Sequence, residues 1–168
     1  MTHRTAEHAF QIRPYRPEDA DGAVEVWARA SETAHAFLGD PAGPERERKI
    51  REIYLVHADN WVAETADGRV VGLLGMLGSE IGGLFVHPDA QGMGIGRALV
   101  AFAAARHRSV TLDVYEENAK ARAFYAHLGF TEKSRGHEDD EDSGHLVITL
   151  RLTGAPRAAG SAPVDAEV

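Results

Sequence analysis

Three glycines, Gly92, Gly94 and Gly96, form the part of the sequence whose residue types and spacing most suggest chemistry. They follow an apolar stretch at residues 81–86 and lead directly into a segment whose apolar residues recur at helical spacing. Glycines at alternate positions let the backbone approach a bulky anion, and the start of a helix adds unpaired amides and the positive end of its dipole. The segment therefore predicts a diphosphate site.

Two common phosphate-binding patterns do not fit this segment. A G-x-G-x-x-G dinucleotide pattern would need glycine at position 97 or 99, where the chain has Arg97 and Leu99. The nucleoside-triphosphate loop also fails, because no Gly-Lys-Ser or Gly-Lys-Thr follows the glycines. A tight strand-to-helix turn that uses glycine only for its geometry stays open as the alternative.

Two segments carry a resemblance to a known family, the GCN5-related N-acetyltransferases (GNAT). The glycine segment resembles the family's acyl-CoA signature Q/R-x-x-G-x-G/A, beginning at Gln91. Residues 118–130 are similar to its second signature, N-x-x-A-x-x-F-Y-x-x-x-G-F. Residues 27–38 further resemble a stretch of bacterial acetyltransferases of the YjaB type, although Ala30 and Ala34 replace a Ser and a Thr there. The resemblance implies transfer of an acetyl group from acetyl-CoA to a primary amine.

The resemblance also assigns roles to individual residues. Main-chain amides of the loop would hold the diphosphate, the β-strand before it would hold the pantetheine arm, and the amide of Val86 would polarise the thioester carbonyl. Tyr125 would protonate the leaving thiolate, and Glu80 or His35 would take the proton of the amine. The residues expected to contact acetyl-CoA are Leu84, Phe85, Val86, Gln91, Gly92, Met93, Gly94, Ile95, Gly96, Arg97, Asn118, Arg122 and Tyr125.

Several of these residues also have ordinary structural interpretations. Arg97 and Arg122 could be solvated surface arginines, and the Tyr125 ring could simply pack in the core. His35 could be hydrogen-bonded in a turn between helices. No metal site is expected, because the His and acidic residues near position 138 match neither the zinc-helix nor the EF-hand spacing. The acidic residues 138–142 predict either a solvated loop or a negative collar that attracts cationic amines.

The elements that must position these groups follow from periodicity and turn residues. Strands are expected at residues 10–13, 60–65, 69–77, 81–86, 110–114, 130–134 and 146–152. Helices are expected from Pro17 on through Val24 and Trp27, and at residues 44–57, 94–106 and 118–128. The order β-α-α-β-β-β-α-β-α-β-β predicts an α+β fold with a mixed sheet, and the family resemblance makes that sheet mostly antiparallel with helices on both faces. One domain is expected at residues 9–152, between a flexible start (1–8) and a disordered tail (153–168).

Composition limits the partners. Among 168 residues, 18 Lys and Arg face 26 Asp and Glu, a net charge of −8 that argues against general nucleic-acid binding. No cysteine is present, which excludes disulfides and a Cys nucleophile, and no apolar run approaches a membrane span. The expected setting is the cytoplasm, the expected partners are acetyl-CoA and a cationic amine, and a homodimer is left open. The amine could belong to a protein lysine or to a polyamine, aminosugar or antibiotic. The alternative to an enzyme is a non-catalytic module that senses acetyl-CoA.

Overall fold

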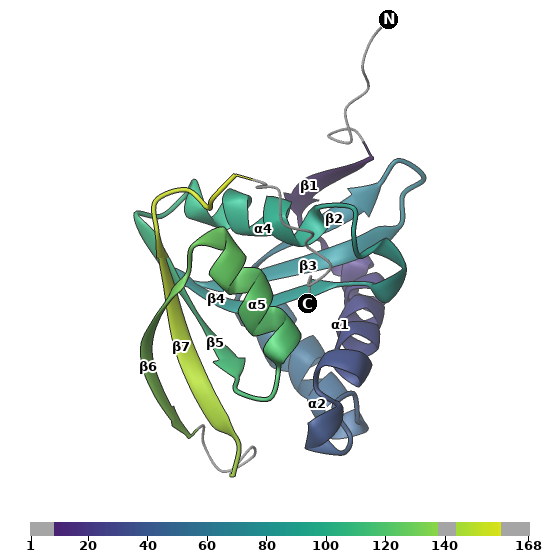
Figure 1. Cartoon of the computed structure of the whole chain (residues 1–168). Coiled ribbons are helices and arrows are strands. Elements are labelled where there is room, and N and C mark those ends of the chain that lie inside the picture. Colours follow the sequence, from purple (N-terminus) through teal and green to yellow (C-terminus); the bar gives the residue numbers. More distant parts are fainter. Residues whose placement is uncertain (1–8, 138–143, 159–168) are drawn as a thin grey trace, which may run out of the picture.

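A computed structural model describes residues 9–137 and 144–158, so the acidic residues 138–142 and the N-terminal residues 1–8 lie outside the described part. Its centre is a single sheet in the order β1-β2-β3-β4-β5-β7-β6 (Figure 1). The strands are β1 (Phe10–Pro14), β2 (Asp59–Thr65), β3 (Val70–Leu77), β4 (Glu80–Val86), β5 (Ser109–Tyr115), β6 (Thr131–His137) and β7 (Leu146–Thr153). Only β4 and β5 pair in parallel; the other neighbours are antiparallel, which confirms the predicted mixed sheet.

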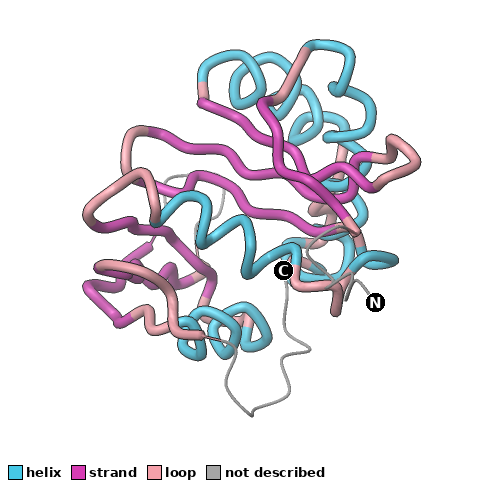
Figure 2. Tube along the Cα trace, turned by 90° about the horizontal axis from the view of Figure 1, so that it is seen from above, coloured by secondary structure: helices cyan, strands magenta, loops and turns pink. Residues whose placement is uncertain are grey.

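Helices cover both faces of this sheet (Figures 1 and 2). They are α1 (Ala20–Ala34), α2 (Pro44–Lys49), the π-helix η4 (Ile50–Tyr54), α3 (Leu55–His57), α4 (Ile95–Ala104) and α5 (Ala119–Leu128), with short 3-10 turns η2 (Pro17–Asp19), η3 (Ala36–Leu38) and η5 (Pro88–Ala90). The element order is the predicted one. The structure differs from the prediction in the charged helix expected at residues 44–57, because the middle turn of that helix is a π-helix. None of the described helices has the length and apolar character to cross a membrane.

Two apolar layers hold the helices to the sheet. On one face Trp27 of α1 is buried against Val62 and Leu73, and on the other Ile95 and Leu99 of α4 are fully buried with side chains of α5. Helix α4 lies close to β3 because position 72 is glycine: an added Cβ would stand 2.9 Å from Cγ2 of Ile95 and 3.0 Å from Cβ of Ala63. The two layers fix α1 and α4 on opposite sides of β4, the strand that precedes the glycine loop.

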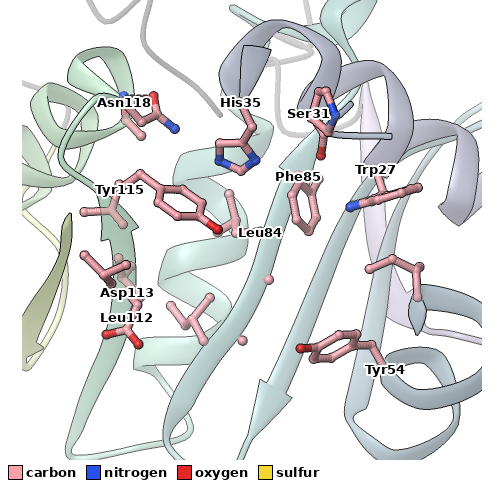
Figure 3. Close-up of a pocket in the computed structure, with 18 of the residues that line it drawn as sticks. Trp27, Ser31, His35, Tyr54, Leu84, Phe85, Leu112, Asp113, Tyr115 and Asn118 are labelled. Atoms are coloured by element: carbon pink, nitrogen blue, oxygen red, sulfur yellow. Dashed lines mark hydrogen bonds between the residues drawn. The ribbon is translucent and has the colours of Figure 1, made fainter. Parts of the chain in front are cut away.

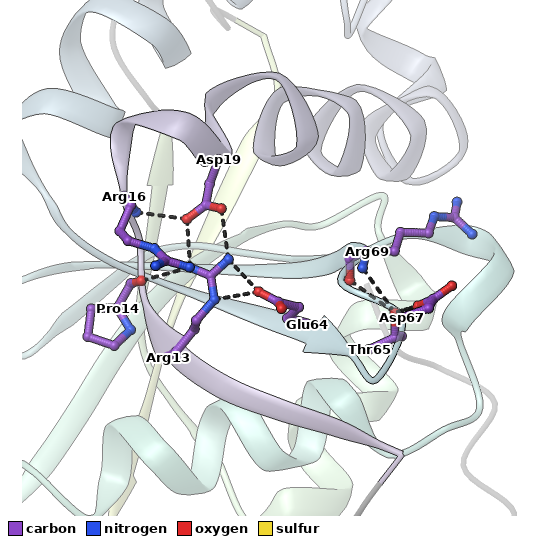
Figure 4. Close-up of polar contacts among 8 residues, drawn as sticks. All are labelled: Arg13, Pro14, Arg16, Asp19, Glu64, Thr65, Asp67 and Arg69. Atoms are coloured by element: carbon purple, nitrogen blue, oxygen red, sulfur yellow. Dashed lines mark hydrogen bonds and ion pairs between the residues drawn. The ribbon is translucent and has the colours of Figure 1, made fainter.

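An ion cluster ties the start of α1 to the sheet edge (Figure 4). Arg13 donates to both carboxylate oxygens of Asp19 at 2.8 Å and also binds Glu64. Asp19 is 9% exposed and additionally accepts from the backbone N of Arg16 at 2.8 Å. The Arg13 guanidinium lowers the pKa of Asp19 below its usual range, because the paired carboxylate is favoured over the acid. The cluster therefore fixes the first turn of α1 relative to β1 and β2.

The folded part continues past the predicted boundary at residue 152. Strand β7 ends at Thr153, after which Gly154 N donates to Arg108 O at 3.2 Å and Arg157 N donates to Leu128 O at 2.8 Å. Residues 154–158 thus run over the end of α5, a path that the Ala-, Gly- and Pro-rich composition of this segment did not indicate.

Candidate active site

The site begins where β4 and β5 separate. These parallel strands pair only at Glu80 with Thr111 and at Ile81 with Leu112. The register of β4 against β3 skips Gly82, which makes a β-bulge at the same point. A bulge bends its strand and ends regular pairing, so β4 leaves β5 and the two backbones face each other across a gap (Figure 3).

A cavity of about 410 Å³ occupies this gap and extends toward α1 and η4 (Figure 3). Its walls come from segments far apart in the chain. From the helices they include Trp27, Ser31, His35, Arg46, Lys49, Tyr54, Asn118 and Tyr125; from the strands they include Glu80, Gly82, Gly83, Leu84, Phe85, Asp113 and Tyr115. Six residues predicted from the sequence are therefore brought together: His35, Glu80, Leu84, Phe85, Asn118 and Tyr125.

The β4 backbone offers donors to this cavity. His87 N donates to Val71 O at 2.8 Å, and in an antiparallel ladder the direction of N–H groups alternates along a strand. The N–H groups of Val86 and Leu84 therefore turn away from β3 and toward β5. Leu84 lines the cavity, whereas Val86 lies beyond it. The sequence selected Val86 for the thioester carbonyl; the geometry favours Leu84 for that position and Val86 for a contact nearer the glycine loop.

The glycine loop has the backbone that its sequence predicts. Gly92 and Gly94 have φ values of +85° and +83°, in the left-handed region that other residues rarely adopt, and Gly94 is the N-cap of α4. The first bond within α4 runs from Ala98 N to Gly94 O at 3.0 Å. The amides of Ile95, Gly96 and Arg97 precede it and have no acceptor within the helix, so they can bind an anion.

A side-chain link joins the glycine loop to α5. Gln91 Nε2 donates to Val86 O and Lys120 Nζ donates to Gln91 Oε1, both at 3.4 Å. Sequence reasoning missed Lys120, which brings a positive charge to the loop from the second signature segment. The signal was available, since a Lys follows Asn118 by two positions at the predicted start of a helix.

The two arginines expected at the phosphates make other contacts. Arg97 Nη1 donates to Arg157 O at 2.7 Å, and Arg122 Nη1 donates to Glu116 O at 3.2 Å. Neither side chain lines the cavity. Met93 is partly exposed beside the glycines, with 37% of its surface accessible. Direct phosphate contacts from these side chains stay predictions.

Asn118 and Tyr125 lie at the α5 wall of the cavity. Asn118 is the N-cap of α5, where its Oδ1 accepts from Ala121 N at 3.1 Å while its amide nitrogen points into the cavity (Figure 3). Tyr125 is 5% exposed, and its ring contacts Phe124 and Phe130 at centroid distances of 5.1 and 5.2 Å. Burial raises the pKa of the Tyr125 hydroxyl, because the phenolate is poorly solvated there. The hydroxyl therefore stays protonated well above neutral pH.

Further polar and aromatic groups of the cavity come from α1, β4 and β5. The His35 ring lies 5.2 Å from the Tyr115 ring, which also contacts Phe37 at 5.2 Å. Glu80 is exposed at the start of β4, and Asp113 accepts a hydrogen bond from Thr149 Oγ1 at 2.6 Å. Glu80 and His35 both face the cavity, so both candidates for the base are retained. Sequence reasoning missed Tyr54, Asp113 and Tyr115, which belong to no local motif, and Ser31, which occupies a variable position within the stretch 27–38.

Among residues 9–137 and 144–158, no group of three or more His, Asp or Glu side chains is arranged to hold a metal ion. The cavity instead fits a thioester arm. The Leu84 amide and the backbone of Gly82 and Gly83 lie along one side of it, and the Phe85 ring packs over Gly83. The amides at the start of α4 lie outside the cavity lining, beyond Val86.

Comparison with known proteins agrees with this geometry. A GNAT acetyltransferase domain model matches residues 57–132. The peptidyl-lysine N-acetyltransferase YjaB of Escherichia coli is 33% identical over 146 residues, which are 87% of this chain and 99% of YjaB. The chain belongs to the GNAT acetyltransferases. This GNAT protein is accordingly an acetyl-CoA-dependent N-acetyltransferase, with acetyl-CoA as its co-substrate.

Solved structures place this GNAT chain in the same fold. The solution structure of apo YjaB from E. coli aligns with a TM-score of 0.77 at 32% identity, covering 87% of this chain and 99% of that one. A PaiA N-acetyltransferase from Thermoplasma acidophilum, solved in complex with coenzyme A, aligns with a TM-score of 0.66 at 18% identity, over 86% and 98% of the two chains. The second likeness supports the fold alone.

Proposed function

We propose that this protein acetylates the side-chain amine of lysine residues in proteins or peptides. The observation that carries the proposal is the cavity at the β4–β5 gap, whose lining combines the Leu84 backbone and Tyr125 with the acidic side chains Glu80 and Asp113. The carboxylates of Glu80 and Asp113 suit a cationic amine. The name of the YjaB relative, a peptidyl-lysine N-acetyltransferase, supports the same acceptor.

The reaction needs a carbonyl polariser, a base and a group that stabilises the leaving sulfur. The Leu84 amide donates a hydrogen bond to the thioester oxygen, which gains negative charge as the amine nitrogen attacks. Glu80 or His35 accepts the proton that the amine loses. The carbon–sulfur bond then breaks, and the Tyr125 hydroxyl donates its hydrogen bond and proton to the departing sulfur. Because no enzyme nucleophile is needed, the amine attacks directly while both substrates are bound.

The main-chain amides of residues 94–97 and the Lys120 side chain hold the diphosphate in this proposal, and the Asn118 amide nitrogen donates to the pantetheine arm. The loop acts through backbone N–H groups, whose positions depend on the left-handed conformations of Gly92 and Gly94. A cytoplasmic location and self-association stay predictions from the sequence.

Release of free thiol from acetyl-CoA tests the proposal directly. Turnover should be highest with lysine peptides, lower with polyamines, and absent without an amine. A preference for an aminosugar or a polyamine over every lysine peptide would replace the proposed acceptor class. Thermal stabilisation by acetyl-CoA without thiol release on any amine would instead indicate a non-catalytic sensor.

A further inference from the structure

Ser31 on α1 carries a hydroxyl that the fold itself does not use. The residue is 1% exposed and its Oγ is buried. Among the buried side-chain oxygen and nitrogen atoms of the described residues, this Oγ alone has no hydrogen-bond partner. A helical serine usually bonds to the carbonyl one turn back or to solvent. Leaving a buried hydroxyl unpaired destabilises the folded state, so the group is expected to have a partner that the chain does not supply.

That hydroxyl lies in a row of polar groups along α1. Trp27, Ser31 and His35 follow one another at intervals of four residues, which places them on one side of the helix, and all three line the cavity. In Figure 3 the indole nitrogen of Trp27 and the Ser31 oxygen both point into the space beside Phe85. Two hydrogen-bonding groups from successive turns thus face the acceptor side of the site.

The chemistry of this pair selects a ligand. An indole N–H can only donate, and a serine hydroxyl can donate as well as accept. A carbonyl or carboxylate oxygen satisfies both groups, because it can accept one hydrogen bond from each of them. A simple alkylamine has no such atom.

The geometry points to Ser31 and Trp27 as a specificity site that binds a carbonyl oxygen of the acceptor molecule, the molecule whose amine is acetylated. This inference rests on the proposed function. The carbonyl could belong to a peptide main chain or to the carboxylate of a free amino acid. Ser31 and Trp27 can donate to either kind of carbonyl oxygen, while the amine of the same acceptor molecule extends toward Leu84 and Tyr125.

Spectroscopy tests this binding without turnover. The protein contains two tryptophans, and Trp61 contacts Phe102 at a centroid distance of 5.3 Å and does not line the cavity. With coenzyme A present, titration of Nα-acetyl-lysine N-methylamide should shift the indole N–H resonance of Trp27 and leave that of Trp61 in place, with Trp61→Phe used for assignment. Equal shifts on titration of 1-aminopentane, which has no carbonyl, would overturn the proposal.

Kinetics on Ser31→Ala gives a second test. Loss of one hydrogen bond should lower the ratio of kcat/KM for Nα-acetyl-lysine N-methylamide to that for 1-aminopentane by about tenfold. Thr33→Ala, which removes an exposed hydroxyl from the same helix, should keep the wild-type ratio. A higher kcat/KM for the methylamide than for free lysine assigns the site to peptides, and the reverse assigns it to amino acids.

Stability separates this role from a structural one. Because the hydroxyl has no partner among residues 9–137 and 144–158, Ser31→Ala should have a Tm equal to or above that of the wild type. A lower Tm, or an unchanged substrate ratio, would overturn the inference. If no amine is acetylated at all, the proposed function fails, while the Trp27 resonance still decides whether the carbonyl site exists.

Discussion

The two sides of the cavity differ in the kind of polar group they offer: main-chain amides on one side and side chains on the other. On the side of the glycine loop, the groups proposed to bind acetyl-CoA are main-chain amides of β4 and α4, and their positions depend on a bulge and on left-handed glycines. On the side of α1 and η4, the polar groups that line the cavity are side chains, those of Ser31, Tyr54 and His35. Backbone donors suit a co-substrate that never changes, whereas side chains can be exchanged without altering the fold. We infer that acceptor choice depends on the second side.

Tyr125→Phe should have the largest effect, because it removes a proton donor and leaves the ring in place. We expect kcat to fall by roughly 100-fold, with the Kd of acetyl-CoA nearly unchanged. Burial raises the pKa of Tyr125, so the neutral hydroxyl persists above pH 10 and the wild-type rate should not decline between pH 8 and 10 through its ionisation. Steady-state kinetics and calorimetry would show this; equal losses in kcat and affinity would assign Tyr125 to packing.

Gly94→Val tests the backbone side. Gly94 and Gly68 have nearly equal φ values, +83° and +86°, and an added Cβ meets nothing within 4 Å at either position. Valine should therefore destabilise the protein similarly at both sites, by ~1–2 kcal/mol. Only Gly94→Val should also weaken acetyl-CoA binding, by roughly tenfold, since it displaces the amides at the start of α4. Similar acetyl-CoA affinities in the two variants would contradict the backbone site.

Glu80→Gln and His35→Gln compare the two candidates for the base on the acceptor side. The variant that lacks the base should lose roughly tenfold in kcat/KM at pH 7. The loss of kcat/KM in this variant should become smaller as the pH rises toward about 10.4, because a larger fraction of the lysine amine is then already neutral. The other variant should change KM alone. A deficit that does not depend on pH in either variant would exclude both residues as the base.

Asn118 should show the smallest effect, and two variants can separate its two contacts. Asn118→Ser keeps a capping oxygen for α5 and removes the amide donor, so acetyl-CoA binding should weaken a few-fold at nearly constant Tm. Asn118→Ala removes both and should also lower the free energy of unfolding by about 1 kcal/mol. Unchanged acetyl-CoA affinity in Asn118→Ser would limit the residue to capping.

The sequence predicted the backbone side well, for a physical reason. Left-handed turns tolerate few residues other than glycine, and the positions of Gly92 and Gly94 relative to the strand and helix are local, so a short pattern describes them. The order of strands and helices was also predictable, because each element carries its own periodicity. The parallel pairing of β4 and β5 and the bulge at Gly82 needed the structure, since neither depends on local residue preferences.

The acceptor side was harder to predict. Its groups come from α1, η4, β4 and β5, and each is an ordinary residue in its own segment. Ser31 follows Ala30, the position where the similar acetyltransferases carry a serine, so comparison by position suggested that a hydroxyl was missing. Nothing in the sequence distinguishes the π-helix at Ile50–Tyr54 from the α-helix expected there, yet Tyr54 lines the cavity from this turn.

The gap between β4 and β5 has a consequence for the free protein. Amide hydrogens at Leu84 and Val86 face an unfilled edge, so they should exchange with deuterated solvent faster than those of their neighbours that pair with β3. An extended ligand seated there supplies the missing hydrogen-bond partners and links the two parts of the sheet. Resistance of this protein to proteolysis should therefore rise with the supply of acetyl-CoA, because a ligand that binds only the native state stabilises it.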